Sequence, residues 1–243
     1  MLKFLGMSSC FNPTIGYTSA FYIDKKEKRL YIFDIGGNIY ERILVNNLFD
    51  EIKHVTIVIT HGHSDHIAGI SEVIFYLNIV LKIVPDIIYP NKDYMKNYLK
   101  SVAVHDYEYN LYVPCECKYL KIKEYKQEHN DLIEAYGYLF WIDGKSVYFS
   151  GDTHTIQSEP LKLLNDGKLD YMYHEVTKYN NLAHTHINEL KKTIKLELRS
   201  KVTCMHFDDD EVIKMASVAG FNIPKLYNKE SRLLIQPALL YDL

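Results

Sequence analysis

The first part of the chain is a series of short apolar runs separated by turn residues. Strands are predicted over 2–5, 18–23 and 29–33, because each run is rich in strand-forming residues and is bounded by Gly, Pro, Asn or Asp. The run 55–59 is continuously apolar, which is typical of a strand buried on both faces. A polar cluster follows it, and the pattern then predicts a helix over 67–76.

The rest of the chain alternates between strand and helix patterns, and Asp143-Gly144 is a hairpin-turn signal between two apolar runs. The predicted strands are 86–89, 118–126, 133–142, 146–150, 170–174, 201–205 and 232–240, and the predicted helices are 91–102, 156–165, 186–199 and 209–219. No Ser/Gly-rich or Pro-rich linker and no internal repeat divides the chain. We therefore expect residues 1–243 to form one α/β domain with two sheets flanked by helices.

The overall composition is that of an ordinary globular protein, with 47% hydrophobic residues and a net charge of −3 over 243 residues. It excludes a disordered chain and provides no general basic field for a long nucleic acid. The longest apolar stretch, 73–84, contains Asn78 and Lys82 and is too short to span a bilayer. No secretory signal is visible at the N-terminus. We expect a cytoplasmic protein without a membrane partner, in the host cytoplasm if it is phage-encoded.

The cysteines are Cys10, Cys115, Cys117 and Cys204, and nothing else in the chain indicates an oxidising compartment. Cys115-Glu116-Cys117 could bind a soft metal. A lone C-x-C without a second pair, however, favours unpaired thiols over a metal site.

The strongest chemical signal is His61-x-His63-x-Asp65-His66, directly after the strand 55–59. Imidazole and carboxylate ligands together suit Zn²⁺, and less often Mn²⁺ or Fe²⁺. One tetrahedral ion cannot readily use all four, because the adjacent Asp65 and His66 point in different directions. The spacing therefore predicts two ions that share one loop.

Two ions need further ligands, and candidates follow other predicted strands. They are His129, Asp152 and His206, of which Asp152 in Ser-Gly-Asp-Thr is the natural bridging residue. Each alone is an ordinary polar residue, but together they complete a dinuclear set. The predicted metal ligands are His61, His63, Asp65, His66, His129, Asp152 and His206.

This ordered set of motifs resembles the metallo-β-lactamase superfamily over nearly the whole chain. The resemblance implies an αββα sandwich of two mixed sheets with the metals at one edge. It implies two Zn²⁺ ions, or two Mn²⁺ ions. One would be held by His61, His63 and His129, the other by Asp65, His66 and His206, with Asp152 bridging them.

Two further segments narrow the branch. Tyr173-His174-Glu175-Val176-Thr177 resembles the His-Glu-Ala-Thr segment of ribonuclease Z, although Val176 replaces its Ala, and His184-Thr185 resembles the His-Ser/Thr that follows. Gly6-x-Ser8-x-Cys10 through Thr18-Ser19 is similar to the substrate-side loop of the same phosphodiesterase branch.

The long arm that grips tRNA in bacterial ribonuclease Z is missing, because only residues 130–151 lie between His129 and Asp152. An arm-less enzyme of this shape resembles cyclic-nucleotide phosphodiesterases, especially the anti-Pycsar enzymes of phages and bacteria, which destroy cyclic mononucleotide immune signals. The resemblance implies a homodimer that hydrolyses a small cyclic nucleotide to a linear monophosphate. The alternatives are a ribonuclease Z-like tRNA 3′-processing endonuclease and a protein that sequesters a nucleotide without turnover.

The predicted mechanism uses two cations about 3.5–4 Å apart to acidify a bridging water. Asp65 would orient the hydroxide, and His184, held by Glu175, would protonate the leaving oxygen. His186 is the competing proton donor, and the alignment of His184-Thr185 favours His184. Asp34 either positions a metal-binding histidine or caps a strand end, and the sequence does not choose between these roles.

Overall fold

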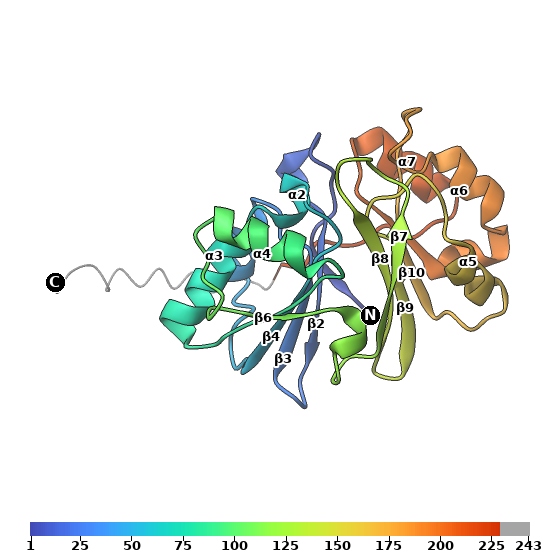
Figure 1. The fold of residues 1–243 in the computed structure, drawn as a ribbon. Helices are drawn as coiled ribbons and strands as arrows, with labels where there is room; N and C mark the ends of the chain where they lie inside the picture. The colour runs from blue at the N-terminus through green and yellow to red at the C-terminus, as the bar shows by residue number, and fades with distance from the viewer. Residues whose placement is uncertain (229–243) are drawn as a thin grey trace.

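Two β-sheets pack face to face, and helices cover the outer side of each (Figure 1). The computed structural model describes residues 1–228, so the strand predicted over 232–240 lies outside the described residues. The predicted fold class, an αββα sandwich with two mixed sheets, is confirmed.

Sheet 1 has the strand order β1-β2-β3-β4-β5-β6, antiparallel up to β3 and parallel from β3 onward. Its parallel strands require crossovers, and the helices of this half supply them. The strands are β1 Lys3–Gly6, β2 Ser19–Asp24, β3 Arg29–Phe33, β4 His54–Val58, β5 Asp86–Ile88 and β6 Asn110–Tyr112. The helical segments are η1 Pro13–Ile15, α1 Ile39–Val45, α2 Ser64–Ile67, α3 Ile70–Phe75, η2 Tyr76–Leu81, α4 Lys92–Ser101 and η3 Pro114–Glu116.

Sheet 2 has the order β11-β10-β9-β8-β7, with β7, β8 and β9 antiparallel and β9, β10 and β11 parallel. The β8–β9 turn is formed by Asp143 and Gly144, both with positive φ (49° and 70°), as the sequence predicted. The strands are β7 Ile122–Gln127, β8 Ala135–Ile142, β9 Lys145–Phe149, β10 Tyr171–Glu175 and β11 Val202–Met205. The helical segments are α5 Ser158–Asn165, α6 Ile187–Thr193, η4 Leu196–Lys201 and α7 Asp210–Val218.

The main core lies between the sheets, where Phe33 of β3 stacks on Phe140 of β8 with ring centroids 4.6 Å apart. A second apolar cluster fills the space between sheet 2 and its helices, and it includes Leu164, Ile187 and Val212. The main core fixes sheet 1 against sheet 2, and the second cluster fixes the helices α5, α6 and α7 on sheet 2. The loops at the sheet edges are therefore carried on a rigid frame.

Several sequence predictions of local structure were wrong. The helix predicted over 186–199 divides into α6 and η4, because the Arg199 guanidinium donates to the carbonyl oxygens of Lys191 (2.6 Å) and Ile194 (3.1 Å) at the end of α6. The helix predicted over 67–76 begins earlier, at Ser64, and continues to Leu81. The strand predicted over 118–126 begins only at Ile122. The short elements α1 and β6 were not predicted, since neither is long enough for its periodicity to be decisive.

The helical run Ser64–Leu81 is long and apolar enough to cross a membrane by length and composition alone. In the structure 44% of it is buried inside the protein. Ile70, Val73 and Ile74 belong to the main core, so this run serves here as a helix packed on sheet 1.

Candidate metal centre

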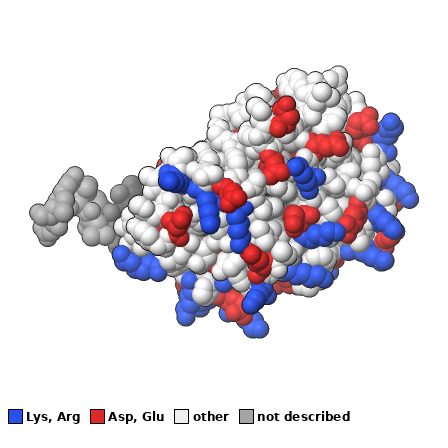
Figure 2. Space-filling model, viewed as in Figure 1, with Lys and Arg blue, Asp and Glu red and all other residues white. Residues whose placement is uncertain are grey.

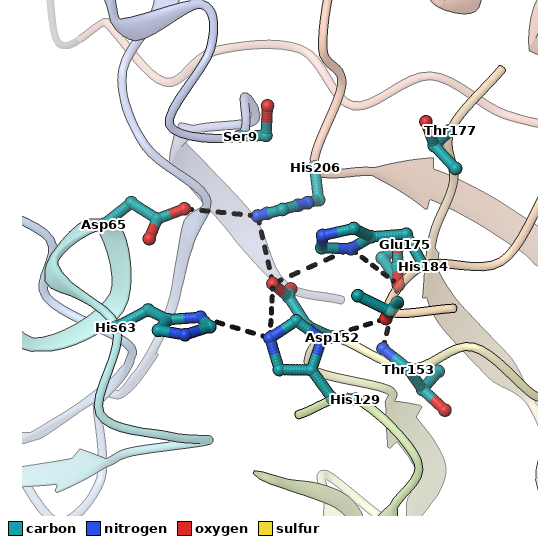
Figure 3. A network of polar contacts seen from close by, with 12 residues as sticks. Ser9, His63, Asp65, His129, Asp152, Thr153, Glu175, Thr177, His184 and His206 are labelled. Carbon is teal, nitrogen blue, oxygen red and sulfur yellow. Dashed lines mark hydrogen bonds and ion pairs between the residues drawn. The ribbon is translucent and has the colours of Figure 1, made fainter. Parts of the chain in front are cut away.

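All the predicted ligands lie at one edge of the sandwich, where loops leave the carboxyl ends of the strands. His61, His63, Asp65 and His66 follow β4, and the remaining three follow strands of sheet 2: His129 after β7, Asp152 after β9 and His206 after β11. Figure 3 shows the Asp152 carboxylate amid the imidazole rings of His129, His184 and His206. Residues far apart in the sequence are thus brought together because the strand ends share one edge.

One group consists of His61, His63, His129 and Asp152, whose ligand atoms all lie within 4.8 Å of one another. His63 Nδ1 is 2.9 Å from His61 Nε2 and 3.1 Å from His129 Nε2. Asp152 Oδ2 is 3.7 Å from His61 Nε2 and 3.9 Å from His129 Nε2. Three imidazoles and one carboxylate oxygen therefore surround a single point.

A second group consists of Asp65, His66 and His206, all buried. His206 Nε2 is 3.2 Å from His66 Nε2 and 3.3 Å from Asp65 Oδ2. Asp152 Oδ2 lies 3.4 Å from His66 Nε2 and 3.3 Å from His206 Nε2, so the same oxygen borders both groups. The structure thus brings together all seven predicted ligands, with Asp152 between the two groups.

The chemistry of the inward-facing atoms fits divalent cations. The outer Nδ1 atoms of His61, His66 and His129 each contact an acceptor oxygen: Thr60 Oγ1 at 3.0 Å, Asp34 Oδ2 at 2.8 Å and the Ala183 carbonyl at 2.9 Å. These contacts place the ring protons on the outside and leave the Nε2 lone pairs facing one another. Burial also lowers the pKa of His61 and His129, which keeps both in the neutral form that a metal requires. Converging lone pairs about 3 Å apart repel one another unless a cation lies among them.

Asp34 is fully buried at the end of β3, where it adopts a left-handed backbone conformation with φ of 60°. Its carboxylate accepts hydrogen bonds from the Thr60 amide (2.7 Å), the Thr60 hydroxyl (2.7 Å) and His66 Nδ1 (2.8 Å). The sequence left open whether Asp34 positions a metal-binding histidine or caps a strand end. In the structure its carboxylate positions His66, and its left-handed backbone ends β3.

Replacing Asp34 with asparagine is expected to weaken metal binding about 10–100-fold, because an Asn side chain loses the charge that orients and polarises His66. Asn tolerates the left-handed conformation, so the backbone should be retained. Competition with a chromophoric chelator measures the affinity. The exposed Asp166→Asn change is the charge-matched control, and equal affinities in both variants would contradict this role.

Glu175 and His184 form a hydrogen-bonded pair beside the metal-ligand cluster. His184 Nδ1 is 3.1 Å from Glu175 Oε1, which also accepts from the Thr153 amide at 2.8 Å. Burial alone lowers the pKa of His184, but the Glu175 and Asp152 carboxylates outweigh it and raise the pKa to about 9. His186 instead caps α6, where its Nδ1 accepts from the Asn188 amide. The structure therefore pairs Glu175 with His184 rather than with His186.

His174 points into the protein on the opposite side of β10 from Glu175 and is completely buried. Its Nδ1 is 2.8 Å from the Glu175 carbonyl oxygen, and its Nε2 has no hydrogen-bond partner within the described residues. Burial lowers its pKa to about 4. It lies outside the ligand groups and is a structural residue.

This buried imidazole makes the metal-free protein sensitive to acid. An unfolded His takes up a proton near pH 6.5, whereas His174 in the fold resists protonation until about pH 4. Its stabilisation is therefore present above pH 6.5 and is lost as the pH falls toward 4. Between pH 7.5 and 5, the free energy of unfolding should fall about 2 kcal/mol more in the wild type than in His174→Leu. Urea titrations in EDTA measure this, and equal pH slopes would refute it.

A pocket of about 290 Å³ opens onto the cluster. Its walls include five of the cluster residues, with Cys10 and Phe11 from the N-terminal loop: His63, Asp65, His129, Asp152 and His206. This places Cys10 and Phe11, within the segment that resembles a substrate-side loop, beside the site. Gly6 is required there because a Cβ would lie 2.1 Å from the Tyr17 carbonyl oxygen. Sequence reasoning missed Phe11, since a lone aromatic residue carries no motif.

The model of the Beta-lactamase superfamily domain matches residues 34–219, which include every ligand in the cluster. The chain belongs to the metallo-β-lactamase superfamily. This chain has the fold of that metallo-hydrolase superfamily and a His/Asp cluster suited to binding metal ions. No curated protein sequence matches the chain.

Solved metallo-β-lactamase folds resemble this one closely in architecture. YhfI from Bacillus subtilis aligns with a TM-score of 0.71 at 14% identity, covering 92% of this chain and 94% of that one. The short form of human tRNase Z aligns with a TM-score of 0.63 at 17% identity, covering 85% of this chain and 92% of that one. A diphosphatase of the PhnP family aligns with a TM-score of 0.63 at 20% identity, covering 85% of this chain and 86% of that one. At these identities the likeness establishes the fold.

Proposed function

We propose that this protein is a metal-dependent phosphodiesterase that hydrolyses cyclic mononucleotides to linear nucleoside monophosphates. The observation that carries the proposal is the Glu175–His184 pair, with His184 Nδ1 3.9 Å from the Asp152 oxygen that borders both ligand groups. A proton donor at that position is suited to a leaving group with a high pKa, such as a ribose hydroxyl.

In this proposal, His61, His63 and His129 hold one ion, Asp65, His66 and His206 hold the other, and Asp152 contacts both. The mixture of imidazole and carboxylate suits Zn²⁺, with Mn²⁺ as the alternative. When bound, two such ions supply an acidified water and neutralise charge on the phosphoryl oxygens.

The chain's own residues then complete the reaction. Asp65 orients the attacking water by accepting its hydrogen bond, in addition to acting as a ligand. Glu175 accepts from His184 Nδ1, which leaves His184 Nε2 to donate a proton to the departing ribose oxygen. The backbone amides of Thr153 and Thr185 donate to the same Glu175 oxygen and fix its position.

The size of the site favours a small phosphodiester. β8, the Asp143-Gly144 turn and β9 occupy residues 135–149, and the residues left, 130–134 and 150–151, are too few for an inserted tRNA-gripping arm. On the face in Figure 2, acidic and basic side chains are interspersed, and the described residues drawn there form no continuous basic stripe. The solved neighbours named above include a diphosphatase as well as a tRNase, so the fold accommodates small phosphate esters. We propose that this activity counters antiphage defence by destroying its cyclic mononucleotide signals.

One preparation loaded with Zn²⁺ or Mn²⁺ should be assayed against cyclic mononucleotides, cyclic dinucleotides and a precursor tRNA. We expect linear monophosphates from the mononucleotides and an intact tRNA. Cleavage of the tRNA with the cyclic nucleotides untouched would select the tRNA 3′-processing endonuclease instead. Tight nucleotide binding without turnover would select a sequestering protein.

A further inference from the structure

A second cavity, of about 460 Å³, adjoins the pocket over the metal-ligand cluster. Phe11 and His184 line both, so the two spaces meet at the proposed proton donor. The remaining walls of the larger cavity come from the loops after β10 and β11: Thr177, Tyr179, Asn181, Asp208 and Asp209. If the cyclic phosphodiester lies at the cluster and its leaving ribose oxygen lies at His184, the base attached to that ribose extends into this cavity.

Two aromatic side chains face this cavity although they are substantially exposed to solvent. Phe11 is 74% exposed and Tyr179 is 50% exposed. The Tyr179 hydroxyl donates to Asp209 Oδ2 at 3.0 Å, and the Lys178 ammonium lies 5.2 Å from the Tyr179 ring centroid. Tyr179 is therefore held in place before any ligand binds. Exposed aromatic rings on the wall of a cavity are suited to stacking on a planar ring.

Among the polar residues of the cavity wall, the Asp208 side chain is buried, with only 8% of the residue exposed. Its two oxygens accept from the Ser9 hydroxyl at 2.9 Å and the Thr177 hydroxyl at 2.5 Å, so the carboxylate is fixed in one orientation. No Lys or Arg of residues 1–228 forms an ion pair with it, and the Lys178 ammonium pairs with Asp209 and Glu211 instead. Each carboxylate oxygen retains acceptor capacity for a ligand.

We propose that this cavity holds the nucleobase of the substrate and that Asp208 selects guanine. The inference rests on the proposed function, since it assumes a nucleotide bound at the cluster. A carboxylate only accepts hydrogen bonds, and guanine presents two adjacent donors, N1–H and the 2-amino group, that match its two oxygens. Adenine and cytosine place a ring-nitrogen acceptor beside their single amino donor, and uracil flanks its N–H with two carbonyl oxygens. A fixed carboxylate therefore disfavours those three bases.

The test compares kcat/KM for cyclic GMP, cyclic IMP and cyclic AMP on the metal-loaded full chain. Inosine keeps N1–H but lacks the 2-amino group, so we expect the order GMP, IMP, AMP, with the extremes about 10–100-fold apart. Asp208→Asn replaces one acceptor oxygen with a donor and should reduce the GMP-to-AMP ratio to within about threefold of unity. Asp210→Asn, an exposed neighbour with the same charge change, should leave the ratio unchanged.

Ser9→Ala distinguishes base recognition by Asp208 from a purely structural role of its hydrogen bonds, because it removes one hydrogen bond to Asp208 and keeps the carboxylate. It should lower thermal stability while preserving the base order. Calorimetric binding of linear GMP and AMP gives a readout that needs no turnover. Turnover of cyclic nucleotides without a guanine preference would overturn this inference alone. GMP binding that depends on Asp208 in a protein without turnover would uphold it and refute the proposed function.

Discussion

Zinc-loaded protein in which both His61 and His63 are replaced by alanine is expected to lose hydrolysis of cyclic nucleotides by on the order of 10³-fold or more. The double change removes two of the three imidazoles of the first ligand group, in which His63 Nδ1 contacts His61 Nε2 and His129 Nε2. Without them the metal that acidifies the nucleophile is not retained, and water at its ordinary pKa is a poor nucleophile at neutral pH.

Two measurements check this result. Elemental analysis of dialysed protein should show fewer bound metal ions per chain, and activity on bis(p-nitrophenyl) phosphate should fall in parallel with activity on cyclic nucleotides. The matched control is the His54→Ala, His105→Ala double variant, which removes two exposed imidazoles outside the cluster. Full activity in the His61/His63 variant would remove the basis of the metal mechanism.

Replacing His184 with alanine is expected to lower kcat on cyclic nucleotides about 10²–10⁴-fold, the usual contribution of a general acid. Most of the bound metal should be retained, because the seven predicted ligands are unchanged and His184 Nδ1 is closer to Glu175 (3.1 Å) than to the Asp152 oxygen (3.9 Å). The loss should nearly vanish on bis(p-nitrophenyl) phosphate, since nitrophenolate leaves without a proton. Equal losses on both substrates would show that His184 has a different role, such as metal binding.

The same assignment predicts the pH profile. The donor is the protonated imidazole. The Glu175 carboxylate raises the pKa of His184 and so favours the donor form, and turnover should fall once the pH exceeds the pKa of His184 in the metal-loaded enzyme. Glu175→Gln removes the anion that raises this pKa and should move the fall to lower pH. The shift is read from kcat against pH on a cyclic nucleotide, and an unchanged profile would contradict the pairing.

Much of the architecture could be predicted from local pattern. The apolar runs gave most strands of both sheets, and Asp143-Gly144 marked its hairpin because few residue pairs adopt positive φ twice in succession. The failures lie where distant groups decide local structure. The end of α6 depends on Arg199, whose guanidinium donates to the Lys191 carbonyl oxygen. The same guanidinium also donates to the Ala219 carbonyl oxygen, a contact that forms only once α7 has packed nearby.

The sequence by itself predicted a metal-binding loop, because His61, His63, Asp65 and His66 lie within six residues and their chemistry is evident from residue type and spacing. Only the tertiary structure decided how they are used. It placed the Asp152 oxygen between the two groups, set Asp34 against His66 and paired Glu175 with His184 rather than with His186. It also made a cavity wall from Phe11, Tyr179 and Asp208, which no motif connects. The physical reason is that ligand identity is a property of single residues, whereas orientation and enclosure arise from strand ends that meet only when the two sheets pack.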